Sequence, residues 1–492
     1  MLQLIHQAQQ NLSNTAIISG GTSFSYQTLL IDSQQFATQL LAQKPDLAEA
    51  RVAFMVMPGY DYVKVQWGIW QAGGIAVPLC ISYPIASLQY VIEDTEAEII
   101  VVSPIFEQTL RPLVQEKGLR MIVLGSEQPT EIGSLPSIDT SRRAMILYTS
   151  GTTNLPKGVV STHANLEAQI STLVKAWEYN ESDHILCILP LHHVHGIINV
   201  ICCTLWAGGT VEFLPEFSAE GVFSAFKKQK INVFMAVPTI YFKLIAHWEG
   251  LPSEQQQEIS AVLKSFRLMV SGSAALPVSV MEKWEQISGH RLLERYGMTE
   301  IGMALSNPYL GERLAGHVGM PLPGVGVRLV DDEQQIVEQG QPGEIQVKGA
   351  TVFSEYWRRE KATADSFTDD GWFRTGDIAV VEGESYKILG RNSVDIIKSG
   401  GYKISALEIE EVLRTHPEIA DCGVVGIADD EWGELVAAVL VLKANNLNTN
   451  ELNSWIRERL PAYKVPRRYY IASDLPRNAM GKVTKNDLKK YF

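Results

Sequence analysis

The sequence lacks long hydrophobic runs and is poor in cysteine. No stretch of about 18 consecutive apolar residues occurs, so we expect no membrane-spanning helix. The five cysteines show no CxxC spacing, which predicts a reduced, cytoplasmic setting with the thiols as small apolar fillers. The opening residues MLQLIHQAQQNL contain no basic start, no long apolar run and no arginine, so we expect neither a signal peptide nor a transit peptide.

Positive charge is also in short supply. The formal net charge is −13, which argues against nucleic acid as the main partner, because such a partner needs a basic face. A nucleotide is compatible with this charge, since it needs only local positive charge. With 492 residues the chain is about three times as long as a typical domain, so we expect two or more domains, in a monomer or a homodimer.

Hydrophobic patterns divide the chain into an alternation of strands and helices. Short apolar runs at residues 98–102, 121–124 and 144–147 predict buried strands, and residues 62–72 predict an amphipathic helix. A domain boundary is expected at residues 392–393, because the chain then restarts as a compact unit. In that unit we expect helices at 406–413 and 449–460 and strands at 422–427 and 436–442.

Residues 148–159, YTSGTTNLPKGV, form the most informative stretch. Small residues let backbone N–H groups approach an anion, hydroxyls add donors, and one lysine adds charge, so this loop predicts phosphate binding. It is not a Walker A loop, because Pro156 precedes the lysine and Gly158 follows it. The candidate phosphate-binding residues are Thr149, Ser150, Gly151, Thr152, Thr153 and Lys157.

A second polar stretch, PLHHVHG, places His192, His193 and His195 within four positions. Three closely spaced histidines could hold a metal ion, but no acidic or cysteine ligand is near in the sequence. The alternative is that they are hydrogen-bonded walls of a substrate pocket.

The whole loop at 148–159 resembles the phosphate loop of the adenylate-forming (acyl-activating) enzymes, with Asn154 where that family usually has glycine. The runs RLLERYGMTE, GWFRTGD, SGGYK and PRNAMGK resemble further motifs of the family, so the resemblance covers nearly the whole chain. It implies an α/β fold: a large N-terminal domain of packed mixed sheets with helices, residues 1–391, and a small mobile α+β C-terminal domain, residues 392–492. It also implies a ligase that uses ATP, Mg²⁺ and coenzyme A.

The resemblance assigns roles to matching residues. Lys482 would enter the site for the first half-reaction only, Glu300 and Thr152 would hold Mg²⁺, His193 would line the carboxylate pocket, and Ser393 would be the hinge. Of these residues, Lys482, Glu300, Thr152 and His193 are the expected catalytic residues. Besides the phosphate loop, the expected ATP and coenzyme A contacts are Ser273, Ala274, Tyr296, Gly297, Thr299, Asp377, Arg391, Gly400 and Gly401.

The substrate is indicated by Arg295, which stands where many relatives have a small residue. A buried guanidinium requires a carboxylate partner. Glu294 should point away if the run is extended, so a second carboxylate on the substrate is the expected partner; the alternative is a salt bridge to Glu294 or another side chain. Arg313 is a further candidate cation. PLHHVHG has no aspartate to hold an ammonium group, which argues against an amino acid.

The runs ERYGMTE and GRNSVDIIKSGGYKISALE resemble the malonyl-CoA synthetases within that family. The expected reaction therefore joins malonate or methylmalonate to coenzyme A through an acyl-AMP intermediate. Two alternatives stay open: a ligase for another short or medium carboxylic acid, and a stand-alone adenylation enzyme that loads a carrier protein. A non-catalytic nucleotide-binding protein would require defects at Lys157, Glu300, Asp377 or Lys482, and all four are present.

Overall fold

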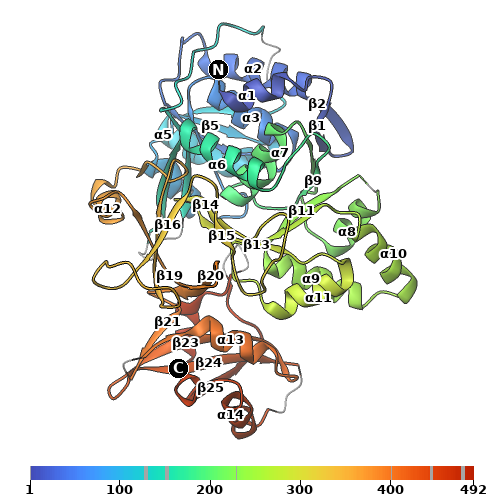
Figure 1. The fold of residues 1–492 in the computed structure, drawn as a ribbon. Helices are drawn as coiled ribbons and strands as arrows, with labels where there is room; N and C mark the ends of the chain where they lie inside the picture. The colour runs from blue at the N-terminus through green and yellow to red at the C-terminus, as the bar shows by residue number, and fades with distance from the viewer. Residues whose placement is uncertain are drawn as a thin grey trace.

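Two large sheets, a smaller antiparallel sheet and a separate C-terminal sheet organise the protein (Figure 1). The structure is a computed structural model that describes residues 2–126, 131–149, 155–228, 230–400, 402–443, 447–477 and 482–492. Within these ranges the sheets have nine, seven, four and five strands. This confirms the expected fold class, an α/β protein with mixed sheets and a smaller C-terminal domain. The exact boundary between residues 391 and 392 stays a prediction.

The nine-stranded sheet is central to the site. Its strands are mostly short and buried on both faces, as in β11 and β12, because helices cover them. In spatial order the strands are β15 (Met320–Pro321), β14 (Gly302–Ser306), β13 (Leu293–Met298), β12 (Leu268–Ser271), β11 (Val233–Ala236), β9 (His184–Cys187), β10 (Thr210–Phe213), β1 (Thr15–Ser19) and β2 (Thr22–Ser25).

The seven-stranded sheet contains Thr149 and Lys157, the described residues on either side of the predicted phosphate-binding stretch. Its inner strands β3, β4 and β5 are parallel and apolar, whereas β7 and β8 form an antiparallel hairpin. The spatial order is β18 (Glu355–Tyr356), β8 (Lys157–Thr162), β7 (Arg143–Thr149), β4 (Ile75–Pro78), β3 (Arg51–Met55), β5 (Ile99–Val102) and β6 (Arg120–Val123). The strands expected at 98–102, 121–124 and 144–147 are thereby confirmed.

Helices pack around these two sheets, and several begin at a side-chain cap. Thr162 and Asn165 form a capping box at the start of α6, and Ser25 caps α2. The helices are α1 (Gln3–Gln9), α2 (Tyr26–Leu41), α3 (Tyr60–Gln71), α4 (Ile85–Asp94), α5 (Glu107–Lys117), α6 (His163–Ala176), α7 (Cys203–Trp206), α8 (Ala219–Lys227), α9 (Pro238–Glu249), α10 (Ser253–Leu263), α11 (Val278–Ser288) and α12 (Glu360–Asp365), with a π-helix at His195–Cys202. In the described part of the chain, none is long and apolar enough to cross a bilayer.

A four-stranded antiparallel sheet leads to the C-terminal domain, which is drawn orange to red in Figure 1. The linking sheet contains β16 (Gly326–Val330), β17 (Gly343–Lys348), β19 (Phe373–Glu382) and β20 (Ser385–Arg391). The C-terminal domain contains β21 (Ile396–Ser399), β22 (Tyr402–Ser405), α13 (Ala406–Arg414), β23 (Ile419–Asp429), β24 (Gly433–Leu442), α14 (Thr449–Arg457), β25 (Arg468–Ala472) and α15 (Lys485–Leu488). Its two expected helices and two expected strands are confirmed.

The two parts meet at a tight turn between β20 and β21. The amide of Asn392 donates to the carbonyl of Gly376, and the amides of Val394 and Asp395 both donate to the carbonyl of Arg391. Ser393, the expected hinge, lies exposed at the centre of this turn. The chain therefore changes direction at Ser393, between backbone hydrogen bonds on both sides of it.

Candidate active site

Four adjacent strands of the nine-stranded sheet end at one edge. Strands β9, β11, β12 and β13 run parallel to one another, so their carboxyl ends lie side by side. The histidine stretch follows β9, the turn at 271–275 follows β12, and Arg295 and Tyr296 lie within β13. Ligand sites form at such carboxyl ends in α/β sheets. The topology thus brings together three motifs that are up to about 100 positions apart.

Arg295 is buried inside this edge, with 3% of its surface exposed. Its Nη2 donates to the Ser273 hydroxyl at 3.2 Å, and its Nε has no hydrogen-bond partner among the described residues. Glu294 points the other way, as the alternation of a strand predicts, and its Oε1 accepts from the amide of Leu276 at 3.0 Å. No ion pair joins Arg295 to a carboxylate in the part of the chain that the structure describes.

Burial disfavours the charge on both neighbouring residues. It lowers the pKa of Arg295 to about 10, against the attraction of Glu294, and raises the pKa of Glu294 to about 8. Arg313, the second candidate cation, is placed elsewhere: it donates to the carbonyls of Pro308, Arg291 and Tyr309 and so holds a loop. Of the two candidate arginines, Arg295 is therefore the one with a donor left for a ligand.

The three histidines line the same space. His195 Nδ1 lies 3.3 Å from the Ser273 hydroxyl, and the rings of His192 and His193 have centroids 4.0 Å apart. Burial lowers the pKa of His193 to about 3 and of His195 well below its usual range, so both rings are neutral at physiological pH. Among the described residues, no group of three His, Cys, Asp or Glu side chains could hold a metal ion. The contact of His195 with Ser273 is the observation that favours the pocket-wall alternative.

Ser273 and Ala274, two of the expected ATP contacts, lie in the 271–275 turn, where Ala274 is exposed. Ser273 has a left-handed backbone with φ of 68°, and its hydroxyl lies between Arg295 and His195. A non-glycine residue in this conformation is uncommon and costs free energy, which is typical of functional sites.

Lys482 of the C-terminal domain reaches this site. Burial is the main cause that lowers its pKa to about 8, and the positive charges of Arg391 and Arg295 add to that shift, whereas Asp377 opposes it. The charge of Lys482 in turn lowers the pKa of His193 and His195. Lys482 is therefore close enough to Arg295, Arg391 and Asp377 for their charges to act on it.

Tyr296, Asp377 and Arg391 form a hydrogen-bonded chain. The Tyr296 hydroxyl donates to Asp377 Oδ2 at 2.5 Å, and Arg391 Nε donates to Asp377 Oδ1 at 3.2 Å. The register of β19 and β20 sets this geometry, because Asp377 and Arg391 are direct partners across the strands. The predicted nucleotide-binding residues of two separate motifs are therefore in contact.

Glu300 and Lys157 both contact Tyr356. Its Oε1 accepts from the Tyr356 hydroxyl at 3.0 Å, and burial raises its pKa. Lys157 lies over the Tyr356 ring, with its Nζ 5.0 Å from the ring centroid. Tyr356 thus connects the predicted metal ligand to the predicted phosphate lysine. Tyr356 was not predicted from the sequence, because it belongs to the two-residue strand β18 and to no motif.

Gly297 and Thr299 surround the turn after β13. A Cβ on Gly297 would lie 2.1 Å from the carbonyl oxygen of Gly302, so only glycine fits the close approach of β13 and β14. Thr299 is half-buried in that turn, next to Glu300. Both residues are therefore held at the same sheet edge.

Part of the predicted site falls outside the described residues: Ser150, Gly151, Thr152, Thr153 and Gly401. The flanking Thr149 and Lys157 are direct partners at the end of the β7–β8 hairpin. Gly400 has φ of 55° in the turn after β21, and its amide donates to the carbonyl of Trp432 at 2.9 Å. Gly400 is thus tied to the C-terminal domain itself.

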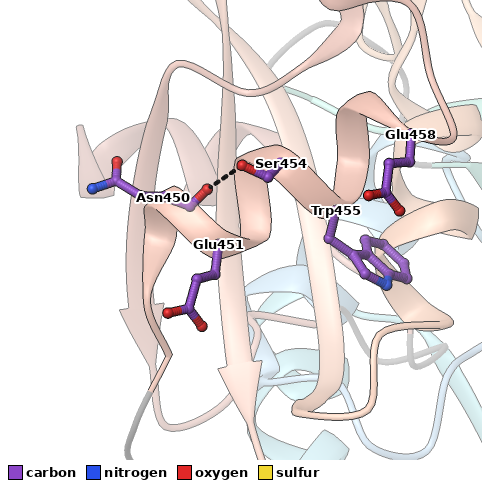
Figure 2. A pocket seen from close by; sticks show the side chains of 5 residues that line it. All are labelled: Asn450, Glu451, Ser454, Trp455 and Glu458. Atoms are coloured by element: carbon purple, nitrogen blue, oxygen red, sulfur yellow. Dashed lines mark hydrogen bonds between the residues drawn. The ribbon is translucent and has the colours of Figure 1, made fainter.

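A surface hollow on α14 is unrelated to these residues. Figure 2 shows its lining side chains, with the Ser454 hydroxyl donating to the carbonyl of Asn450 at 3.1 Å. Trp455 faces it, and the guanidinium of Arg459 lies 3.9 Å from the Trp455 ring. None of the predicted site residues lines this hollow.

The fold and this site define the class of the protein: the chain belongs to the AMP-binding enzyme family. The pattern of that family, described as AMP-binding enzyme, matches residues 4–357, and the AMP-binding enzyme C-terminal domain matches residues 408–482. The chain is similar to the mitochondrial malonate–CoA ligase of Mus musculus, with 46% identity over 91% of this chain and 82% of that protein. It is also similar to a malonate–CoA ligase of Arabidopsis thaliana, with 39% identity over 98% of this chain and 87% of that protein.

Solved structures support the same placement. ATP-bound MatB from Rhodopseudomonas palustris matches with a TM-score of 0.89 and 31% identity, covering 99% of this chain and 98% of that chain. The apo form of the same protein matches with a TM-score of 0.83 and 32% identity over the same shares of the two chains. The present structure is therefore more similar to the ATP-bound form than to the apo form.

Proposed function

We propose that the protein is an AMP-forming malonate–CoA ligase, with methylmalonate as a second acid of the same class. The observation that carries the proposal is Arg295, a buried guanidinium whose described hydrogen bond goes to the neutral hydroxyl of Ser273. The similarity to the malonate–CoA ligases of Mus musculus and Arabidopsis thaliana supports the same acid.

Arg295 favours a short dicarboxylate for an electrostatic reason. Burying a cation without an anionic partner costs several kcal/mol, and a ligand carboxylate recovers that cost through charge-assisted hydrogen bonds. The Nε and Nη groups of Arg295 provide donors that a carboxylate could accept. The neutral rings of His193 and His195 add no competing charge. We assign Arg295, Ser273 and His193 to the acid.

The first half-reaction joins two anions. A carboxylate oxygen of the acid attacks the α-phosphorus of ATP, a new P–O bond forms, and the bond to pyrophosphate breaks. The barrier is lowered by positioning and by neutralising charge. We assign Lys482 to drawing the two anions together, because its ammonium lies among Arg295, Arg391 and Asp377.

The remaining contacts hold the nucleotide. We assign Asp377 and Arg391 to the ribose, Tyr296 to stacking on adenine, Thr299 to the α-phosphate, and Lys157 with the phosphate loop to the outer phosphates. Glu300 suits Mg²⁺, because a buried carboxylate with a raised pKa gains from a cation and Mg²⁺ takes only one or two protein carboxylates. When bound, Mg²⁺ neutralises phosphate charge, and Thr152 is the second proposed ligand.

In the second half-reaction the thiol of coenzyme A attacks the acyl carbonyl, a C–S bond forms, and the C–O bond to AMP breaks. We assign the two glycines at 400–401 to this step. In this structure Gly400 packs against Trp432 while Lys482 lies in the site. Rotation of the C-terminal domain about Ser393 would withdraw Lys482 from the site and present Gly400 there instead. Such gating of successive steps by a domain movement is physically ordinary.

The test is pyrophosphate release with a panel of acids: malonate, methylmalonate, acetate, propionate and octanoate. We expect malonate to be preferred, and Arg295→Met to lose roughly 30-fold or more in kcat/KM for malonate while gaining relative activity on monocarboxylates. The matched control is Arg459→Met, on the α14 surface, which should leave the panel unchanged. An enzyme that ignores malonate and activates octanoate would contradict the proposal.

Thiol choice and cellular context complete the proposal. Replacing coenzyme A by a phosphopantetheinyl carrier protein distinguishes a ligase from a stand-alone adenylation enzyme, and we expect activity with coenzyme A alone.

We propose a cytoplasmic monomer or homodimer. The similar Mus musculus protein is mitochondrial, so cell fractionation is the decisive measurement of location. Light scattering of the purified protein measures the oligomeric state.

A further inference from the structure

A carboxylate of the C-terminal domain caps a helix of the N-terminal part. Oε1 of Glu411, on α13, accepts a hydrogen bond from the backbone amide of Val278 at 2.7 Å. Val278 is the first residue of α11, and its N-cap residue Pro277 provides no side-chain cap. The first amides of a helix need such an acceptor, and the helix dipole favours a negative charge at this end. Figure 1 shows α13 on the side of the C-terminal domain that faces α11.

On the N-terminal side, this contact lies directly behind the acid-binding residues. Val278 comes five positions after Ser273, and the amide of Leu276 donates to Glu294, the neighbour of Arg295. The negative charge of Glu411 contributes to the raised pKa of Glu294, although burial is the larger cause. The capped end of α11 and the turn that carries Ser273 are therefore one short segment.

On the C-terminal side, the contact is linked to the segment of Lys482. Glu410, next to Glu411, forms buried ion pairs with Lys485 and Arg414. Lys485 lies three positions after Lys482, and its Nζ is also 3.6 Å from Asp395, at the end of the turn that contains Ser393. Helix α13 thus carries Glu411, and its Glu410 binds Lys485, which in turn pairs with Asp395 at the interdomain turn.

We propose that Glu411 is a positioning residue for Lys482: its cap on α11 holds the C-terminal domain where the lysine reaches the site. The proposal rests on the proposed two-step function. Rotation about the turn at residue 393 moves α13 away from α11, so the cap must break before the thiol step. Glu411 thus stabilises the arrangement for the first half-reaction and contributes nothing to the second.

Its test separates the two half-reactions. We expect Glu411→Ala to lower acid-dependent ATP–pyrophosphate exchange roughly 3- to 30-fold, the range that loss of a cap predicts. Thioester formation from supplied acyl-adenylate and coenzyme A should be unchanged or faster. Glu411→Gln keeps an acceptor oxygen and should recover part of the exchange rate. The matched control is Glu408→Ala, because Glu408 lies on the same helix but pairs with Lys464 inside the domain at 2.6 Å.

Two results would overturn the proposal: exchange unchanged in Glu411→Ala, or both half-reactions reduced in the same proportion, as general damage to the domain would produce. A thermal melt of each variant identifies such damage. The exchange is measured with whichever acid of the panel the wild-type protein activates best. Absence of malonate-dependent exchange in the wild type would therefore contradict the proposed substrate and still leave the Glu411 contact testable.

Discussion

The guanidinium of Arg295 lies directly against the backbone of Gly272. A Cβ at Gly272 would come within 2.7 Å of both Cζ and Nε of Arg295. The position of the buried Arg295 guanidinium therefore requires glycine at position 272. Any larger side chain there must displace the guanidinium.

Gly272→Ala should consequently impair use of malonate. The added methyl group would push the guanidinium out of its place, and we expect kcat/KM for malonate to fall roughly 10-fold or more, because small displacements in a positioned site are costly. Acid-panel kinetics measure the effect, with propionate as the internal control. Equal losses for malonate and propionate would contradict a specific effect on Arg295.

Adenylation should decline in alkaline solution because Lys482 loses its proton. Burial and the nearby arginines lower the pKa of Lys482 to about 8, so the cation that attracts two anions is present below that pH and lost above it. We expect kcat/KM for pyrophosphate exchange to fall about tenfold per pH unit well above pH 8. Lys482→Arg, which stays charged, should show no such decline whatever its absolute rate. A wild-type profile that is flat to pH 10 would contradict this assignment.

The stability of the fold should depend on pH through Glu294. Its pKa is raised from about 4.5 to about 8 by burial, so the folded protein holds a proton that the unfolded chain releases. That contribution to stability is fully present below about pH 4.5 and is lost as the pH rises to about 8, at about 1.4 kcal/mol per pH unit. Glu294→Gln should remove this dependence. Urea denaturation of both proteins from pH 5 to 8 tests it, and parallel curves would show that Glu294 does not titrate as expected.

Tyr356→Phe should weaken Mg²⁺ use. The variant keeps the ring under Lys157 but loses the hydroxyl that donates to Glu300, and a hydrogen bond to a charged group contributes about 1.5–3 kcal/mol. We expect the Mg²⁺ concentration for half-maximal exchange to rise about tenfold. Tyr402→Phe, at an exposed tyrosine stacked on Tyr463, is the matched control. If the two variants have equal Mg²⁺ requirements, Tyr356 does not support Glu300.

The sequence predicted those parts of the fold whose pattern is local. The strands at 98–102 and 144–147 were readable because short apolar runs between polar turns are typical of buried strands. The opposite directions of Glu294 and Arg295 followed from the two-residue period of a strand. Candidate site residues at 273, 295, 296, 377 and 482 came from motifs, and their proximity follows from a sheet order that no local pattern contains.

Contacts that depend on that order could not be predicted. Tyr356 reaches Glu300 because β18 pairs with β8, about 200 positions earlier in the chain. The contacts of the Ser273 hydroxyl with Arg295 and His195 form because β12 and β13 are neighbours in the sheet. The cap from Glu411 to Val278 links two domains, so nothing near either residue in the sequence indicates it.

The burial of all five cysteines has a chemical consequence for an enzyme that hands an activated acyl group to a thiol. Burial raises the pKa of Cys187 to about 12 and also raises the pKa of Cys202, Cys203 and Cys422, so these thiols stay protonated and poorly nucleophilic. Cys187 ends β9, only a few residues before the histidines of the pocket. These four thiols are thus poor competitors of the incoming thiol for the mixed anhydride.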